Sequence, residues 1–293
     1  MKEGASPWAE WSLQLFRLSL LKQEKWRAIA RLLGPMEHQS GLDIGGDNGV
    51  ISLLLRRQGG AWTSAEGSAP AVAAIRRLVG DRVVEIEGHR LPLADGQFDV
   101  VVIIDYLEHV IADEAFIAEC HRVLKPHGTL VVNTPHCKRS PLHALRRLLG
   151  LTDRRHGHVR PGYTVNQLFN VLKNGFDVQE VQTYSRCCSQ LLDTGIRWIS
   201  ERRGVPRDAV KGALIGEAEF RRLGKLIRLY RALYPLFWLA VQMDRLLFFT
   251  RGFMLIVRAR RRNWIPRAAT PVLRDGRSLA EATLGGHIGS AAT

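Results

Sequence analysis

A glycine-rich turn lies where a short apolar strand passes into a helical segment. Residues 43–49 read Asp-Ile-Gly-Gly-Asp-Asn-Gly, and a helical stretch begins at Val50. Because glycine has no Cβ atom, a ligand can approach the backbone of such a turn closely. The dinucleotide pattern Gly-x-Gly-x-x-Gly and the Walker A pattern are both missing here, which disfavours a diphosphate ligand. The turn predicts either a nucleotide-like ligand without a diphosphate or a tight strand-to-helix connection that binds nothing.

An acidic side chain follows the next predicted strand. Glu66 stands 17 residues after Gly49, at the end of the strand expected over Ala61 to Ala65. A carboxylate in this place can accept hydrogen bonds from both vicinal hydroxyls of a ribose, a geometry that few other side chains satisfy. The turn and Glu66 together predict a nucleoside-bearing ligand without a diphosphate, and S-adenosylmethionine is the best-known cofactor of that kind.

Alternating strands and helices must position these groups. We predict a leading helix over Trp8 to Leu33, ended by Gly34 and Pro35, and then alternating strands and helices through residue 133. The expected strands cover 42–44, 61–65, 83–86, 98–104, 129–133, 176–184 and 253–258; the expected helices cover 50–57, 69–79, 113–124, 165–172 and much of 188–249. Such alternation implies a parallel sheet with right-handed crossovers and a ligand at the carboxyl ends of the strands.

Composition narrows the class of protein. The 293 residues are 46% hydrophobic, enough for a full core. Because no apolar run of about 18 residues occurs and the first ten residues have no signal-peptide core, we expect a cytoplasmic protein. The four cysteines lack zinc or disulfide spacing. The net charge of +14 is concentrated in residues 186–262, where 17 Lys and Arg face 6 Asp and Glu. This regional excess points to a polyanionic partner or an anionic membrane surface.

Three further stretches complete a resemblance to a known family. They are Leu91 to Asp99 (LPLADGQFD), Asp105 to Val110 (DYLEHV) and Arg122 to Gly128 (RVLKPHG). With the turn, their order and spacing make residues 41–133 similar to class I methyltransferases of the ubiquinone/menaquinone-biosynthesis type. The resemblance implies an α/β fold with a doubly wound, mostly parallel, seven-stranded Rossmann-like sheet. It also implies S-adenosylmethionine as cofactor and in-line methyl transfer to a small or lipid-linked acceptor.

The resemblance implies roles for residues on the methionine side of the cofactor. Asp43 would position the ammonium group, while Gly45 and Gly49 would let the methionine portion approach the backbone. Asp105 would border the methionine end. Asp47 stands where the family often has glycine, but aspartate tolerates a left-handed backbone better than most residues.

On the nucleoside side, the resemblance implies that Glu66 holds the ribose and that Gly88 and His89 contact the adenine. His89 departs from the acid or amide that the family usually has there. It can stack on adenine or hydrogen-bond to it.

Three histidines are candidate general bases. A methyl group on a positive sulfur is already electrophilic, so a base is needed only where the acceptor must lose a proton. His109 follows the fourth predicted strand, His136 follows the fifth, and His158 lies in a polar loop that could close over the acceptor. Each is equally interpreted as a solvated or structurally bonded imidazole. Asp105, Glu108 and His109 also resemble a Mg²⁺-binding pattern of some O-methyltransferases, but the pattern recurs in relatives thought to be metal-free, and we expect no metal.

Residues 221–249 combine a basic start with an apolar continuation. The apolar run after Leu233 is interrupted by Asp244 and Arg245, too early for a membrane span, and Pro235 would kink or restart a helix. One hypothesis is an interfacial segment on anionic lipid, and the other is a buried helix that covers the sheet or the acceptor pocket.

The sequence thus suggests four parts. They are a helical lead-in at 1–40, a methyltransferase core at 41–185, a basic and apolar helical insertion with the last strand at 186–262, and a tail at 263–293 that we expect to be disordered. Two rival functions remain. A nucleic-acid methyltransferase would suit the basic half, but interleaved aromatic and basic residues are missing, which disfavours a nucleic-acid partner. A non-catalytic scaffold with the same fold is the second rival.

Overall fold

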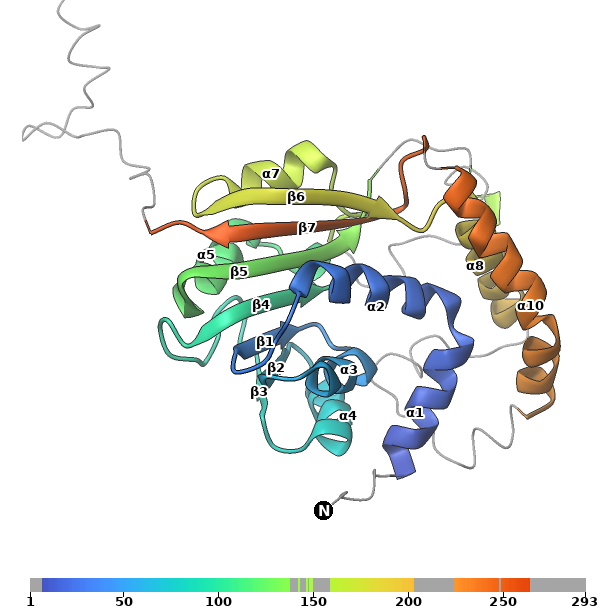
Figure 1. Ribbon diagram of the computed structural model, residues 1–293, viewed down its shortest axis with the longest axis horizontal. Helices are drawn as coiled ribbons and strands as arrows, with labels where there is room; N and C mark the ends of the chain where they lie inside the picture. Colours follow the sequence, from blue (N-terminus) through green and yellow to red (C-terminus); the bar gives the residue numbers. More distant parts are fainter. Residues whose placement is uncertain are drawn as a thin grey trace, which may run out of the picture. The chain divides into compact units, whose positions relative to one another are not determined.

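A seven-stranded sheet forms the centre of the computed structural model, which describes residues 7–137, 142, 146, 148–149, 159–202, 224–247 and 249–263. The strands are β1 Ser40–Ile44, β2 Ala61–Glu66, β3 Val83–Glu85, β4 Phe98–Ile104, β5 Leu124–Pro135, β6 Phe176–Tyr184 and β7 Met254–Arg261. Their order is β3-β2-β1-β4-β5-β7-β6 (Figure 1). β7 runs antiparallel to both of its neighbours, and the other pairs are parallel. The predicted doubly wound, mostly parallel sheet is confirmed.

The helices occupy both faces of this sheet. They are α1 Pro7–Leu18, α2 Leu20–Leu33, α3 Val50–Gln58, α4 Ala69–Val79, α5 Asp113–Val123, α7 Val165–Leu172, α8 Cys187–Arg202 and α10 Gly224–Leu246, with the 3-10 turn η1 Leu107–His109. The prediction of one leading helix over residues 8–33 was wrong. Ser19 has an extended backbone and stands at the N-cap of α2, a position that serine favours. The apolar spacing continues across this break, so periodicity alone could not reveal it.

The apolar run of β4 packs on both faces of the sheet. Val101 and Ile103 belong to the core cluster that contains Phe116 of α5, whereas Val102 and Ile104 belong to the cluster formed with α2 and α3. Successive side chains of a strand point to opposite faces, so a strand buried on both sides needs an unbroken apolar sequence. This arrangement is the reason that residues 98–104 were recognisable as a central strand.

The parallel register brings the ends of four strands to one edge of the sheet, here called the carboxyl edge. Ile44 of β1 pairs with Ala65 of β2 and with Ile103 of β4, and Ile104 pairs with Asn133 of β5. The segments that follow these strands therefore leave the sheet side by side. They contain the glycine-rich turn, Glu66 and Asp105.

Asp244 joins α10 to the start of α8. Its side chain is 3% exposed, and its carboxylate accepts hydrogen bonds from the backbone N–H groups of Arg186, Cys188 and Ser189 at 2.7–3.0 Å and from the Ser189 hydroxyl at 2.6 Å. The first N–H groups of a helix have no partner within it and favour a negative charge. The acidic residue that interrupts the apolar run of α10 is thus a buried cap for α8. α10 itself continues through Pro235 as one helix.

Several predictions from the sequence fall partly or wholly outside the described residues. The predicted tail is described only at Asn263, and His158, Arg221 and Arg222 are not among the described residues. The described residues up to Arg262 belong to one compact unit. The finer four-part division stays a prediction.

We expect Asp244→Ala to lower the free energy of unfolding by about 2–4 kcal/mol, because it leaves buried N–H groups without an acceptor. Asp244→Asn keeps the shape and one acceptor oxygen and should cost less. Urea unfolding followed by circular dichroism measures both, with the exposed Asp81→Ala as control. Equal stability of the Asp244→Ala and Asp81→Ala variants would refute the capping role.

Candidate functional site

The glycine-rich turn has a left-handed backbone at three positions. Gly45 has φ 83°, Asp47 φ 51° and Gly49 φ 79°. A Cβ atom on Gly45 would lie 2.3 Å from the carbonyl oxygen of Ile104 on the neighbouring strand, and one on Gly49 would lie 3.1 Å from the Cα of Ile75. Glycine is therefore required at both positions by backbone conformation and by space. Asp47 adopts the left-handed conformation expected of it.

Asp43 lies beneath this turn and is fully buried. Its carboxylate accepts hydrogen bonds from Ser52 Oγ of α3 at 2.5 Å and from Ser64 Oγ of β2 at 2.8 Å, and Arg56 Nη1 lies 3.4 Å away. Burial raises the pKa of Asp43, while the Arg56 guanidinium and the two hydroxyls oppose that rise. The sequence suggested contact with a cofactor ammonium group, which stays a prediction. The structure shows instead that Asp43 ties β1 to α3 and β2.

Glu66 and the glycine-rich turn are in direct contact. The sequence predicted that the two bind one nucleoside together, and that stays a prediction. Glu66 Oε2 accepts a hydrogen bond from the Asp47 backbone N–H at 3.3 Å, and Oε1 accepts one from the Gly67 N–H at 2.9 Å. The residue is 9% exposed, and burial raises the pKa of its carboxyl group. Tyr106 adjoins this point, because a Cβ atom on Gly67 would lie 2.7 Å from its Oη. Each carboxylate oxygen has further lone pairs with which to accept hydroxyl donors.

Asp105 is held by groups that the sequence analysis missed. Its backbone is left-handed with φ 47°, and its carboxylate pairs with Lys25 Nζ of α2. Asn133 Nδ2 donates to Asp105 Oδ1 at 2.7 Å, and Tyr184 Oη donates to Asn133 Oδ1 at 2.6 Å. Lys22, one helical turn before Lys25, is partly buried. Desolvation lowers the pKa of Lys22, while Asp47 and Asp105 oppose that shift. The available signal was two lysines three residues apart, which lie on the same side of a helix.

Glu108 is buried within the same edge and is 1% exposed. Burial, reinforced by the nearby Asp105, raises the pKa of Glu108 to about 8. Thr134 Oγ1 donates a hydrogen bond to its Oε2 at 3.3 Å. Across the described part of the chain, no group of three or more His, Cys, Asp or Glu residues is arranged to hold a metal ion. Asp105, Glu108 and His109 are therefore not assembled as a metal site in this structure.

The candidate bases differ in their surroundings. His109 ends η1 and is half-buried near the carboxyl edge. His136 is 3% exposed, and its Nδ1 lies 2.8 Å from the Gly252 carbonyl oxygen, so Nδ1 carries the proton and donates it to that oxygen. This bond anchors His136 to the segment before β7. Its role as a base, like that of His109 and His158, stays a prediction.

Gly88 and His89 form an exposed turn after β3. Glu87 pairs with Arg90 across this turn, and Gly88 has φ 65° with open space around its Cα. The turn lies at the end of β3, so it follows the same edge of the sheet as Glu66. Contact of these two residues with an adenine stays a prediction.

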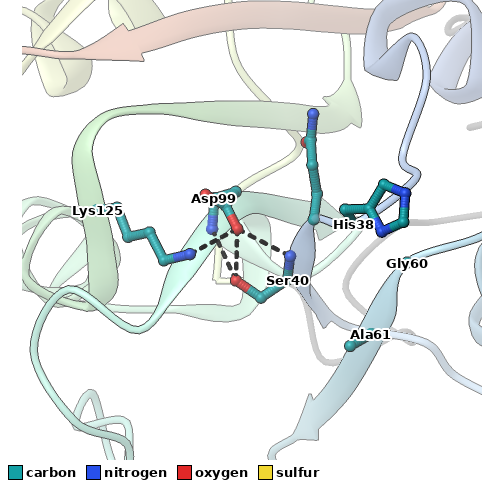
Figure 2. A pocket seen from close by; sticks show the side chains of 7 residues that line it. His38, Ser40, Gly60, Ala61, Asp99 and Lys125 are labelled. Carbon is teal, nitrogen blue, oxygen red and sulfur yellow. Dashed lines mark hydrogen bonds and ion pairs between the residues drawn. The ribbon is translucent and has the colours of Figure 1, made fainter.

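A cavity of about 360 Å³ lies at the opposite, amino edge of the sheet (Figure 2). It is lined by Ser40 and Ala61, the first residues of β1 and β2, together with Asp99 and Lys125 near the starts of β4 and β5. Asp99 accepts hydrogen bonds from Ser40 Oγ at 2.7 Å and from Lys125 Nζ at 2.8 Å. None of the predicted site residues lines this cavity.

Comparison with known proteins identifies the domain that carries the carboxyl-edge site. Residues 42–132 match the family model described as "Methyltransferase domain". The match contains the glycine-rich turn, Glu66 and Asp105, and the strand order places these groups at one edge. The chain contains a class I methyltransferase domain. The cofactor of this domain class is S-adenosylmethionine.

Two curated methyltransferases are similar to this chain over about a third of its length. A ubiquinone biosynthesis O-methyltransferase from Pseudomonas aeruginosa (strain LESB58) is 34% identical over 102 residues, covering 32% of this chain and 43% of the relative. A demethylmenaquinone methyltransferase from Tropheryma whipplei (strain Twist) is 32% identical over 120 residues, covering 39% of this chain and 50% of the relative. The chain thus spans half or less of the length of these relatives.

Solved structures confirm the fold over a longer stretch. A protein from Thermotoga maritima described as a possible histamine N-methyltransferase aligns with a TM-score of 0.52 at 15% identity, covering 87% of this chain and 98% of that one. The [4+2]-cyclase SpnF aligns with a TM-score of 0.54 at 20% identity, covering 82% of both chains. Because the second is a cyclase, the fold by itself does not decide the reaction.

The charged groups at the carboxyl edge of the methyltransferase domain fit S-adenosylmethionine. The cofactor carries a positive sulfonium, a positive ammonium group, a carboxylate and a ribose. Asp47, Glu66 and Asp105 supply negative charge and hydrogen-bond acceptors at this edge, and Lys22 and Lys25 supply positive charge beside them. The chain therefore presents both signs of charge that such a zwitterionic ligand needs.

The turn's dependence on Gly45 can be tested against a second glycine with a similar backbone. We expect Gly45→Ala to lower the free energy of unfolding by at least 3 kcal/mol, since left-handed strain of about 1–2 kcal/mol adds to a clash with the Ile104 carbonyl. Gly88→Ala has similar strain but open space, and we expect it to cost only about 1–2 kcal/mol. Chemical denaturation of both variants measures the difference. Equal losses would contradict the close approach of β1 and β4 at this turn.

Proposed function

We propose that the protein transfers a methyl group from S-adenosylmethionine to a small or lipid-linked acceptor at the carboxyl edge of the sheet. The observation that supports this most strongly is the contact between Glu66 and the glycine-rich turn. Together these two features place a carboxylate that can accept hydrogen bonds from a ribose beside a turn rich in glycine. The match to the methyltransferase family over the same residues supports the assignment of the chemistry.

Several side chains of the carboxyl edge would hold the cofactor. Glu66 would accept hydrogen bonds from the ribose hydroxyls, and Asp105 would border the methionine end of the cofactor. Lys25, now paired with Asp105, would then be available to the cofactor carboxylate, with Lys22 beside it. The bound cofactor supplies an electrophilic methyl group. The chain's own contribution is to align the acceptor with that methyl group and to exclude water from it.

A proton acceptor is needed only for acceptors that carry a proton on the attacking atom. His109 is half-buried beside the carboxyl edge and is the best placed of the described candidate bases. His136 is held by the Gly252 carbonyl, so it is more suited to shape the site than to move a proton. We therefore assign the base, where one is used, to His109.

The class of acceptor is suggested by the relatives. The two curated proteins are named for methylation in ubiquinone biosynthesis and of demethylmenaquinone. The match to the family model ends at residue 132, so residues 186–262 lie beyond it. An acceptor that is itself apolar or lipid-linked would suit both the names of the relatives and the apolar surface of α10.

Part of α10 is suited to lie on a membrane surface. Four apolar residues on one stripe of the helix are more than half exposed: Leu236, Leu239, Met243 and Leu246. Arg228 and Arg231, nearer the start of α10, are also exposed. Within the described residues, no helix combines the length and the hydropathy required to cross a membrane. A basic and apolar exposed helix favours contact with an anionic membrane surface over a role in the core.

Cofactor binding tests the proposed function directly. We expect the wild-type protein to bind S-adenosylmethionine saturably in calorimetry and Glu66→Gln to weaken binding by about 10- to 100-fold, because charge-assisted hydrogen bonds to the ribose are lost. Glu85→Gln is the matched control, since Glu85 is exposed and pairs with Glu66 in the sheet register, and we expect less than a twofold change. Absence of saturable heat with the wild type would favour a non-catalytic scaffold.

Membrane contact is tested by co-sedimentation with vesicles of phosphatidylglycerol and phosphatidylcholine at physiological salt. We expect the wild type to sediment with them and Leu239→Glu/Met243→Glu to stay in the supernatant, since each apolar side chain would contribute roughly 1–2 kcal/mol on insertion into the membrane interface. Ile111→Glu is the control, because Ile111 is 80% exposed and lies outside α10. If the α10 variant sediments as the wild type does, α10 is not the membrane contact.

A further inference from the structure

A second cavity, of about 480 Å³, opens beside the carboxyl end of β6. We call it the arginine cavity, because three of its lining residues are Arg31, Arg186 and Arg251. They come from α2, from the segment between β6 and α8, and from the segment between α10 and β7. Three arginines from separate parts of the chain thus line one cavity.

All the charged residues among the described lining of this cavity are arginines. No Asp or Glu is among the described residues that line it. Arg31 lies 3.7 Å from Glu180, outside the lining, with both side chains substantially exposed, and such a pair is weak. Arg186 Nε donates to the Thr250 carbonyl at 3.1 Å, which uses one of the five N–H donors of a guanidinium. Guanidinium groups match the geometry of phosphate and carboxylate oxygens, so the cavity is suited to an oxyanion.

An exposed apolar surface begins at the same place. Phe249 lines the cavity and is 73% exposed, and Leu246, at the end of α10, is 71% exposed. Further exposed apolar residues of α10 continue from there. A ligand with an anionic head and an apolar tail would pair its head with the arginines and cover part of this surface, which a small inorganic anion cannot do.

The arginine cavity is also connected to the candidate site. Tyr184 lines the cavity, and its hydroxyl donates to Asn133, which in turn donates to Asp105. Asp105 pairs with Lys25 on α2, the helix that also carries Arg31. A ligand in the cavity would therefore lie against a side chain that is two hydrogen bonds from Asp105.

We propose that the arginine cavity binds the phosphate-type head of an amphiphile, with its apolar chain along Phe249 and the end of α10, and that this amphiphile is the methyl acceptor. The identity of the ligand as acceptor rests on the proposed function. Its binding to the cavity does not, because the arginines and Phe249 recognise it without the cofactor.

Dodecyl phosphate below its critical micelle concentration is the probe. We expect saturable binding in calorimetry, at least tenfold weaker binding of inorganic phosphate, and no saturable binding of the uncharged dodecyl maltoside. Arg31→Gln/Arg251→Gln should weaken dodecyl phosphate binding by at least tenfold. Arg57→Gln/Arg82→Gln removes the same charge from exposed positions elsewhere and should change it by less than twofold. Phe249→Ser should weaken binding of dodecyl phosphate but leave inorganic phosphate unchanged.

Two results would overturn the proposal: wild-type affinity in the Arg31→Gln/Arg251→Gln variant, or equally tight binding of dodecyl maltoside. Binding of S-adenosylmethionine to the same variant separates this inference from the proposed function, because it should be unchanged. If the wild type binds dodecyl phosphate but not S-adenosylmethionine, the arginine cavity is an amphiphile-binding site, but its ligand is not a methyl acceptor. Sedimentation with phosphatidylglycerol vesicles then distinguishes a methyl acceptor from a membrane lipid as the ligand of the cavity. If the Arg31→Gln/Arg251→Gln variant no longer sediments with the vesicles, the ligand is a membrane lipid and not the acceptor.

Discussion

The buried carboxylate of Asp43 is the contact on which the candidate site depends. It joins β1 to Ser52 of α3 and to Ser64 of β2, with Arg56 close by. These bonds lie directly beneath the glycine-rich turn, so they set where the turn leaves the sheet. An unpaired buried charge costs roughly 3–5 kcal/mol, and the surrounding partners make Asp43 tolerable here. Because β1 and β2 are held in register at this point, the backbone N–H of Asp47 can reach Glu66.

The acidic side chains and the basic side chains at the carboxyl edge come from two different parts of the chain. The methyltransferase domain places Asp47, Glu66, Asp105 and Glu108 close together, and burial raises the pKa of Glu66 and Glu108. α2 brings Lys22 and Lys25 to the same place, so the acidic edge is partly neutralised by a helix outside the family match. A ligand that carries both signs of charge, as S-adenosylmethionine does, could pair with these groups in place of their present partners.

Much of the fold and part of the site could be predicted from local patterns. The apolar run of β4, the Gly-rich turn and the position of Glu66 are each encoded within a few residues, and the order of elements then brings them to one edge. What could not be predicted are contacts between residues far apart in the chain. Lys25 meets Asp105 across 80 residues, His136 meets Gly252 across 116, and Asp244 caps a helix that begins 57 residues earlier. Ser19 was missed for a different reason, because helices on both sides of it keep the same apolar spacing.

α8 and α10 lie outside the residues that match the family model, and we propose that they form the acceptor side of the molecule. α8 and α10 are joined through Asp244, and the arginine cavity lies where the segments around them meet the end of β6. Cofactor binding at the carboxyl edge is tested most directly by a crystal structure of the protein with S-adenosylhomocysteine, the product form of the cofactor. We expect the ribose hydroxyls within hydrogen-bonding distance of Glu66 and the nucleoside against the turn at residues 45–49. A nucleoside bound elsewhere, such as in the cavity lined by Ser40 and Asp99, would contradict this expectation.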